Sequence, residues 1–252
     1  MNNNVDVWSS LRLTTQSRIG LGRVGSSLPS HRVLEFKAAH AAARDAVHVP
    51  LDAGAFLERV EELGIGSPAV VSSNATSRSE YLRRPDLGRT AADLSALSHT
   101  CDDIGFVLAD GLSPRALADH GIGLLEALIA ELGPIYSIAP PVVALQARVA
   151  LGDHIGHATG VHTTIMLIGE RPGLSVADSL GVYLTHHPKP GRSDADRNCI
   201  SNIHPPDGLD YVRAAKITAT LVAGARQLGR SGVDLKDTST DELAGTDILT
   251  LD

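Results

Sequence analysis

The sequence has little cysteine, few aromatic residues and no excess of basic charge. Only two cysteines, Cys101 and Cys199, occur in 252 residues, which argues against a disulfide scaffold and favours a reducing cytoplasm. Aromatic residues make up 3% of the chain, so few side chains could stack on nucleic-acid bases. The formal net charge is −7, from 22 Lys and Arg against 29 Asp and Glu, and this opposes binding to a phosphate backbone. We expect no nucleic-acid partner.

A long hydrophobic run is also absent from the sequence. No stretch of roughly 18 uncharged apolar residues occurs, so we expect no membrane span and no membrane partner. The first ten residues, MNNNVDVWSS, contain neither a basic nor an apolar segment, and no secretory signal is expected. Apolar residues make up 43% and charged residues 20%, which is typical of a globular protein with a sizeable core.

The first hundred residues are predicted to be mainly helical. The Ala-rich run at 29–47 places Val33 and Phe36 on one apolar stripe, and Pro29 suits a first helical turn. The polar segment 72–89 predicts a loop with short helical turns. The helices expected here span residues 29–47, 53–63 and 90–98.

Beyond residue 100, short apolar runs alternate with helical patterns. The apolar residues of TTIMLIGE, 163–170, are continuous, which predicts a strand buried on both faces. Helices are expected at 114–132, 142–158 and 207–229, and strands at 104–111, 135–139, 163–170, 181–186 and 199–204. This alternation predicts an α/β fold with a doubly wound, mainly parallel sheet, preceded by a helical N-terminal region. We therefore divide the chain into a helical region (1–100), an α/β domain (101–235) and an acidic tail (236–252).

One glycine-rich segment, GLGRVG at 20–25, matches the sequence pattern of the dinucleotide-binding fingerprint. That fingerprint needs a buried strand before it and a helix directly after it. The preceding residues, LRLTTQSRI, do not resemble a buried strand, and the acidic Asp45 falls inside a predicted helix. We expect a connector here, and a nucleotide-dependent enzyme is the weaker alternative.

Six histidines crowd into residues 154–204. His154 and His157 would share one face of a helix beside Asp153, an arrangement compatible with zinc. No third ligand has a signature spacing, so we expect hydrogen-bonded or solvated histidines and no metal site. The order Asp153-His154-Ile155-Gly156 also misses the Asp-x-His-x-x-Gly pattern that places a histidine beneath cobalt.

Two residues could be nucleophiles by type alone. Ser113 lacks the G-x-S-x-G elbow that exposes a serine on a strained turn. Cys199 is a lone cysteine, and such residues are usually small apolar core residues. Neither has a base and an orienting group in the sequence, so a stand-alone hydrolase is not favoured.

The end of the most strongly predicted strand is the best candidate for a binding site. Ligands of open parallel sheets bind beyond the carboxyl ends of the strands, and Glu170 and Arg171 follow the apolar run there. An ion pair that only ends the strand is an equally good interpretation. The residues alone predict a polar-ligand site, and a stand-alone small-molecule-binding module is one alternative.

Taken together, many stretches resemble the small (light) subunit of ethanolamine ammonia-lyase. GERPGL and DADRNCISNIH are the most specific of them, and the resemblance covers about residues 12–235. The other stretches are LTTQSRIGLGRVGSSLP, HRVLEFKAAHAAARDAVHVPLD, RSEYLRRPDLGR, VLADGLSPRAL, VALQARVALGDHIG and TIMLIGERPGLSVADSLGVYLTHHP.

This resemblance implies a lyase that uses adenosylcobalamin to convert ethanolamine to acetaldehyde and ammonia. The large subunit of such an enzyme holds the substrate in a barrel, and the small subunit covers the cobalamin with a Rossmann-like sheet. The resemblance further implies a hetero-oligomer with several copies of each subunit. The cofactor supplies the difficult chemistry, so no catalytic residue is expected on this chain.

Three cofactor contacts carry over by position. Val149 in QARVALGDHIG, Glu170 in IGERPG and Cys199 in DRNCISNIH resemble the valine, glutamate and cysteine with which the family contacts cobalamin. A glutamate can accept hydrogen bonds from amide or hydroxyl groups, while valine and a neutral cysteine offer apolar surface. The sequence lacks the Asp-x-His-x-x-Gly pattern that places a histidine beneath cobalt. This absence is consistent with the resemblance, which implies a cofactor bound in its base-on form.

The expected location is the cytoplasm, and enclosure there in a bacterial microcompartment is left open. Some relatives carry a long leader linked with encapsulation, where this sequence has ten residues. The acidic tail, 236–252, has no counterpart in the resemblance and is expected to be loosely ordered.

Overall fold

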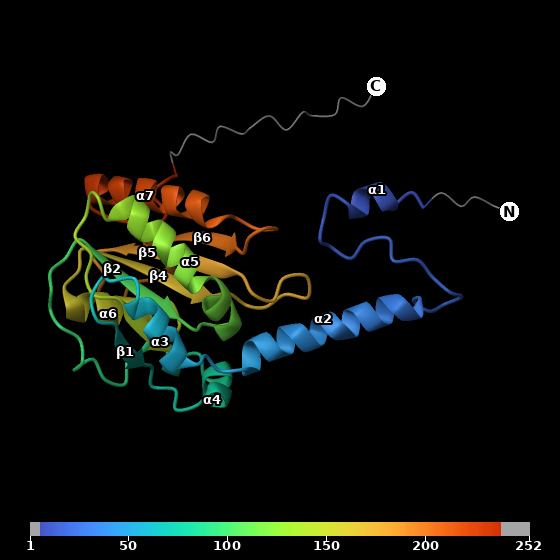
Figure 1. The fold of residues 1–252 in the computed structure, drawn as a ribbon, viewed down its shortest axis with the longest axis horizontal. Coiled ribbons are helices and arrows are strands. Elements are labelled where there is room, and N and C mark those ends of the chain that lie inside the picture. The colour runs from blue at the N-terminus through green and yellow to red at the C-terminus, as the bar shows by residue number, and fades with distance from the viewer. Residues whose placement is uncertain (1–5, 238–252) are drawn as a thin grey trace, which may run out of the picture.

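A six-stranded sheet forms the centre of the computed structural model, which describes residues 6–237 (Figure 1). Residues 1–5 and 238–252, and with them most of the predicted acidic tail, lie outside the described residues. The strand order is β1-β3-β2-β4-β5-β6. The strands are β1 (Ala69–Ser72), β2 (Ile104–Ala109), β3 (Val142–Leu145), β4 (Thr163–Gly169), β5 (Leu180–His186) and β6 (Asn198–Ile203).

The α/β class is confirmed, but the sheet is mixed and the doubly wound, mainly parallel sheet is not confirmed. β1, β3, β2 and β4 pair in parallel, whereas β5 is antiparallel to β4 and β6 is antiparallel to β5. A parallel neighbour needs a crossover of about a dozen residues or more, usually containing a helix. Residues 170–179, between β4 and β5, form a loop without a helix, so the chain turns back directly.

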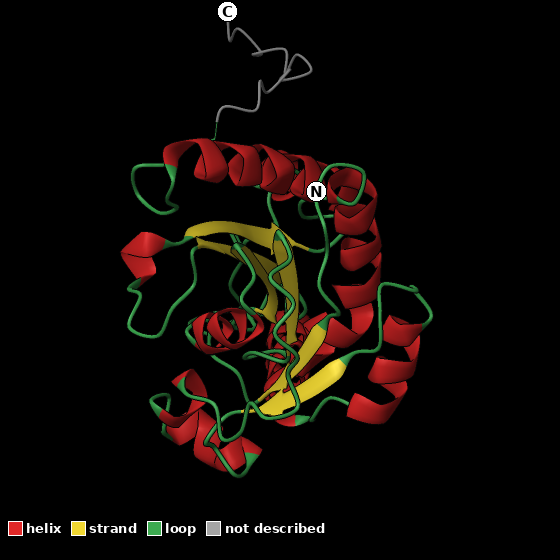
Figure 2. Cartoon of the chain, turned by 90° about the vertical axis from the view of Figure 1, so that its left-hand side faces the viewer, coloured by secondary structure: helices red, strands yellow, loops and turns green. Residues whose placement is uncertain are grey.

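Helices cover both faces of this curved sheet (Figure 2). α5 (Pro114–Leu132) and α7 (Tyr211–Leu228) pack together on one face, and α6 (Leu151–Thr159) packs on the other. Successive β2 side chains alternate between the two layers, so Phe106 belongs to the core under α5 and α7 and Val107 to the core under α6. β2 and β4 are buried along their whole length, which the continuous apolar run at 163–170 predicts for β4.

α5 coincides with the predicted helix at 114–132 because its first turn carries clear signals. Pro114 occupies the first turn, where its missing N–H is not needed. The Ser113 hydroxyl accepts a hydrogen bond from the Ala116 N–H at 3.2 Å and donates to the Ala177 carbonyl at 2.9 Å. Ser113, considered above as a nucleophile, is therefore a helix cap.

Several local predictions are wrong. Residues 142–145 form β3, whereas the sequence predicted the start of a helix at 142–158, and α6 begins only at Leu151. A run of four apolar residues fits a helix or a strand equally well, and pairing with β1 and β2 decides the outcome. The predicted helix at 90–98 consists of bends and turns, and the predicted strand at 135–139 contributes a single bridge.

The N-terminal part contains most of its predicted helices and one strand that was not predicted. β1 lies before residue 100 and pairs with β3, so this region contributes an edge strand to the sheet. The predicted division near residue 100 stays a prediction. The helices are α1 (Ser9–Arg12), α2 (Ser30–His48), α3 (Ala53–Glu61) and α4 (Arg78–Arg83), and single 3-10 turns occur at Leu87–Arg89 and Asp194–Asp196.

α2 projects away from the sheet, and the chain before it turns back beside α1 (Figure 1). We call residues 6–48, which include α1 and α2, the N-terminal arm, and residues 49–237 the body. Within the described residues, no helix is both long enough and apolar enough to cross a membrane.

Candidate functional site

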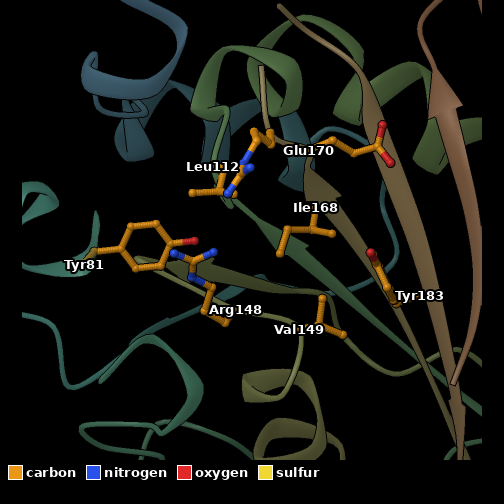
Figure 3. Close-up of a pocket in the computed structure, with 9 residues that line it drawn as sticks. Tyr81, Leu112, Arg148, Val149, Ile168, Glu170 and Tyr183 are labelled. Carbon is orange, nitrogen blue, oxygen red and sulfur yellow. The ribbon is translucent and has the colours of Figure 1, made fainter. Parts of the chain in front are cut away.

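A cavity of about 290 Å³ opens at the carboxyl ends of β2, β3 and β4 (Figure 3). The loops that follow these three strands contribute Leu112, Val149 and Glu170 to its wall. Gly111 and Gly169 let the ends of β2 and β4 approach each other, because a Cβ on Gly111, at φ +54°, would overlap the Gly169 carbonyl. The edge at which the sheet topology predicts a ligand is therefore hollow, and we call it the carboxyl edge.

The cavity combines an apolar surface with a charged and phenolic border. Arg148 extends toward the Tyr81 ring, while the Glu170 carboxylate points away from both at the other side of the cavity (Figure 3). Such a mixture suits a ligand with a broad apolar part and polar groups at its margin. The lining residues are Tyr81, Leu112, Arg148, Val149, Ile168, Gly169, Glu170, Arg171 and Tyr183.

Glu170 is the first residue after β4, where the sequence predicts it. Its Oε2 accepts a hydrogen bond from the Ser179 hydroxyl at 2.7 Å and from the Asn202 backbone N–H at 3.1 Å. These bonds connect the end of β4 to the loop before β5 and to β6. The carboxylate thus has a structural role, and its two described hydrogen bonds go to the same oxygen.

Of the other two predicted contacts, Val149 lines the cavity and Cys199 does not. Val149 lines the cavity from the loop between β3 and α6. Cys199 lies on β6 directly opposite Tyr183 of β5, so the two side chains share one face of the sheet. Burial raises the pKa of the Tyr183 phenol and of the Cys199 thiol, which keeps both groups uncharged at neutral pH. Cys199 is exposed overall and lies beside Tyr183, outside the set of residues that line the cavity.

A buried carboxylate organises the loop that carries Val149. Asp110 follows β2 directly and accepts hydrogen bonds from the backbone N–H groups of Gln146 at 2.9 Å and Ala147 at 3.0 Å. The Arg78 guanidinium lies 3.6 Å from its Oδ2. Burial raises the pKa of Asp110, although these N–H groups and Arg78 act in the opposite direction. This carboxylate connects the ends of β2 and β3.

Tyr81 lies beside two guanidinium groups, and this arrangement was not predicted. The Cζ atoms of Arg78 and Arg148 are 4.8 and 4.6 Å from its ring centroid, close enough for cation–π attraction. Its hydroxyl donates to the Ala147 carbonyl at 2.9 Å. Arg78 Nη2, Arg148 Nε and Gln146 Oε1 are buried without a hydrogen-bond partner, and buried polar groups ordinarily have one. Of these three residues only Arg148 lines the adjacent cavity, where a polar ligand would supply a partner.

A buried ion pair connects the parts of the chain that carry Val149 and Cys199. Asp153, in the first turn of α6, contacts Arg197, which lies two residues before Cys199. Their side chains are only 2% and 1% exposed. The pair therefore fixes the position of α6 relative to the start of β6, and removal of either charge would leave the other buried and uncompensated.

The glycine-rich segment at 20–25 lies in the arm. Its three glycines have φ values of +56°, +79° and +61°, and Val24 pairs with Ser27 in a tight turn. α2 begins only at Ser30. The segment is thus not the strand–turn–helix unit that a dinucleotide requires.

The histidines that were considered as metal ligands occupy separate places. His154 and His157 lie on α6. Among residues 6–237, no three or more His, Cys, Asp or Glu side chains are grouped so that they could hold a metal ion. A second cavity, of about 220 Å³ and bordered by Arg226, is lined by His162, His186 and His187.

Known families and proteins account for nearly the whole chain. The model of the ethanolamine ammonia-lyase light chain family matches residues 5–236. The chain belongs to this family. The ethanolamine ammonia-lyase small subunit of Rhodococcus erythropolis is 68% identical over 249 residues, which are 98% of this chain and 97% of the relative. The resemblance read from the sequence is therefore confirmed.

More distant members of the ethanolamine ammonia-lyase light chain family align over most of the same length. The small subunit of Xanthomonas campestris pv. campestris (strain B100) is 44% identical and covers 96% of this chain and 92% of its own. That of Azotobacter vinelandii (strain DJ / ATCC BAA-1303) is also 44% identical and covers 91% and 88%. The family match includes the three loops of the carboxyl edge and also the N-terminal arm.

Proposed function

We propose that this chain is the small subunit of an ethanolamine ammonia-lyase, which converts ethanolamine to acetaldehyde and ammonia. Its carboxyl edge forms one wall of an adenosylcobalamin site that the large subunit completes. Membership of the light chain family supports the activity. The observation that carries the cofactor site is that Val149 and Glu170, selected from the sequence for this role, come from two separate loops and line one cavity.

The residues of this cavity fit one side of a corrinoid. Leu112, Val149 and Ile168 offer an apolar surface to a flat ring. Glu170 can accept hydrogen bonds from amide or hydroxyl groups, and Arg148, whose Nε lacks a partner, can donate to an anionic or carbonyl oxygen. A volume of about 290 Å³ is at the lower limit of ordinary ligand pockets, so it fits a part of the cofactor and leaves the remainder to the partner.

Each residue of this chain binds or orients in that arrangement, and none is assigned a catalytic role. Val149 would pack against the ring system, Glu170 would accept hydrogen bonds at its margin, and the uncharged Cys199 would lie next to Tyr183 at the border of the site. Adenosylcobalamin, in its base-on form, supplies radical chemistry when bound. The substrate lies in the large subunit, within a hetero-oligomer that contains several copies of each chain. Two free cysteines favour the cytoplasm as its location.

Reconstitution with the large subunit tests this function. The two chains are mixed with adenosylcobalamin and ethanolamine, acetaldehyde is followed, and the cobalamin spectrum is recorded as a separate readout. Glu170→Ala removes an ionised acceptor whose hydrogen bonds are worth about 1.5–3 kcal/mol. We expect the apparent cofactor constant to rise about 10- to 100-fold, while the rate at saturating cofactor changes less.

Ser179→Ala is the matched control, because it removes the intramolecular hydrogen bond to Glu170 Oε2 and leaves the carboxylate in place. Its cofactor constant should stay near that of the wild type. An unchanged cofactor constant together with a collapsed saturated rate in Glu170→Ala would contradict the assignment, because Glu170 would then act in the chemistry.

A further inference from the structure

The N-terminal arm exposes much of its hydrophobic surface. Within α2 only Ala46 is buried, while Leu34 and Phe36 are 66% and 45% exposed. Of the fifteen large hydrophobic side chains that are exposed in the described residues, eight belong to the arm. Concentrated apolar exposure of this kind marks an interaction surface. The other six are Val7, Trp8, Leu11, Leu13, Val24 and Leu28.

This exposed segment has a defined shape before any partner binds. The Trp8 side chain lies against Gly20, where a Cβ would overlap the indole ring, and Gly20 adopts φ +56°. Arg12 forms an ion pair with Asp6 and donates from Nη1 to the Gly20 carbonyl at 2.8 Å. The contacts fold residues 6–20 back on themselves, and a pre-shaped binding segment loses less entropy on association.

The arm stands beside the carboxyl edge. α2 extends past this edge (Figure 1), and its last turn is held by Arg78 of the site, whose Nε donates to the Val47 carbonyl at 2.7 Å. Further out, Arg18 donates to the Leu174 carbonyl at 2.9 Å and Ser175 donates to the Gln16 carbonyl at 3.2 Å. These contacts join the arm to the loop that follows Glu170. A chain that covers the cavity therefore also reaches the arm.

The charge of the arm is opposite in sign to that of the body. The arm carries six Lys and Arg against three Asp and Glu, a net charge of +3, whereas the body carries 16 against 22, a net charge of −6. Complementary charge steers association and fixes the orientation of partners. A partner surface that complements the arm would be apolar and would carry acidic side chains.

We propose that the N-terminal arm is a clamp that packs against the large subunit, with the exposed Leu34 of α2 as a central apolar contact. The inference rests on the proposed function, since the large subunit is the chain that would cover the neighbouring cavity. The family match begins at residue 5, and the Rhodococcus erythropolis relative aligns over 98% of this chain. The arm therefore belongs to the sequence that the light chain family shares.

Substitutions at Leu34 in the full-length chain test the clamp, with Ile135 as the matched control. Ile135 is 68% exposed, almost the same as Leu34, but lies near the amino end of β2. Affinity for the large subunit is measured by calorimetric titration of each variant. Leu34→Asp should weaken binding about tenfold or more and Leu34→Ala about threefold, since buried interface anchors dominate affinity. Ile135→Asp should bind like the wild type.

The outcomes separate the clamp from the proposed function. Alanine preserves helix propensity, so an unchanged circular dichroism spectrum and melting temperature in Leu34→Ala would assign the weaker binding to lost contact. If the wild type binds and Leu34→Asp binds equally well, the clamp is refuted and the partnership stands. If the wild type does not bind the large subunit at all, the proposed function itself fails. The wild type could instead self-associate through the arm. If Leu34→Asp abolishes that self-association and leaves binding of the large subunit unchanged, the arm binds a second copy of this chain and the clamp is refuted.

Discussion

The body and the N-terminal arm of this chain use their hydrophobic residues in opposite ways. The body buries them in two clusters, one on each face of the sheet, so its stability depends on its own packing. The arm buries one side chain of α2 and leaves its larger ones exposed. Burial contributes free energy to folding only where it occurs within the chain. The contrast therefore implies that the body determines the stability of the protein and that the arm is available for recognition.

The largest expected effect comes from a charge buried in the body. Arg197→Met leaves Asp153 buried and uncompensated, and should lower the free energy of unfolding by about 3–5 kcal/mol. The arm contains an exposed pair, Arg32 with Glu35 at 2.8 Å, for which Arg32→Met should leave the free energy of unfolding nearly unchanged. Urea denaturation measures both. Equal losses would mean that the arm folds as part of the same cooperative unit as the body.

A matched pair of leucines compares the two regions directly. Leu125 of α5 is fully buried in the core between α5, α7 and the sheet, whereas Leu34 of α2 is 66% exposed. Leu125→Ala should cost about 2–5 kcal/mol of stability through lost burial and the cavity it leaves. Leu34→Ala should change stability by about 0.5 kcal/mol or less. Thermal melts of the two variants check the contrast, which fails if Leu34→Ala lowers the melting temperature as far as Leu125→Ala does.

The sequence predicts those parts of the fold that depend on local signals and misses those that depend on pairing between distant segments. α5 has a capping serine, a first-turn proline and a long helical pattern, and β4 has a continuous apolar run, so local signals suffice for both elements. β1 and β3 have four residues each, and such short runs become strands only because they pair with each other and β3 pairs with β2. The antiparallel direction of β5 depends on the loop before it rather than on its own residues.

The candidate site was predictable to a similar extent. Glu170 follows a strongly predicted strand, so the rule that ligands bind at strand ends selects it. The family resemblance adds Val149, which lines the same cavity, and Cys199, which does not. Asp110, Tyr81 and Arg148 carry no signal of their own, because their association results from the pairing of β2 with β3 and of α4 with the loop after β3. The one sequence signal at Asp110 is the Asp-Gly pair that ends the run at 104–111, and this pair predicts a turn rather than a binding site.

The body should also respond more steeply to acid, because it buries a histidine. The pKa of His186 is lowered to about 4, first by burial and then by the nearby His187, Arg226, His162 and Arg192. The unfolded chain binds a proton near pH 6.5, so this contribution to stability is complete above that pH and is lost as the pH falls toward 4. The loss should not exceed about 1.4 kcal/mol per pH unit. Melting temperatures between pH 7 and 5 measure this loss of stability. His186→Gln should make the melting temperature depend less on pH. An equal slope in that variant would show that other groups cause the pH dependence.

The smallest expected effect on stability lies where the arm touches the body. Arg18→Ala removes the hydrogen bond to the Leu174 carbonyl, which is exposed to water, so global stability should fall by about 0.5 kcal/mol or less. Locally, amide hydrogens of residues 16–20 should exchange faster, because the arm loses one of its attachments to the loop after Glu170. Binding of the large subunit should weaken a few-fold, since the arm must then be ordered on association. Arg23→Ala removes the same charge at an exposed arginine of the same arm, so it should leave exchange unchanged and weaken binding less than Arg18→Ala does. A loss of several degrees in melting temperature for Arg18→Ala would show instead that the arm supports the fold of the body, and the separation between a region for stability and a region for recognition would fail.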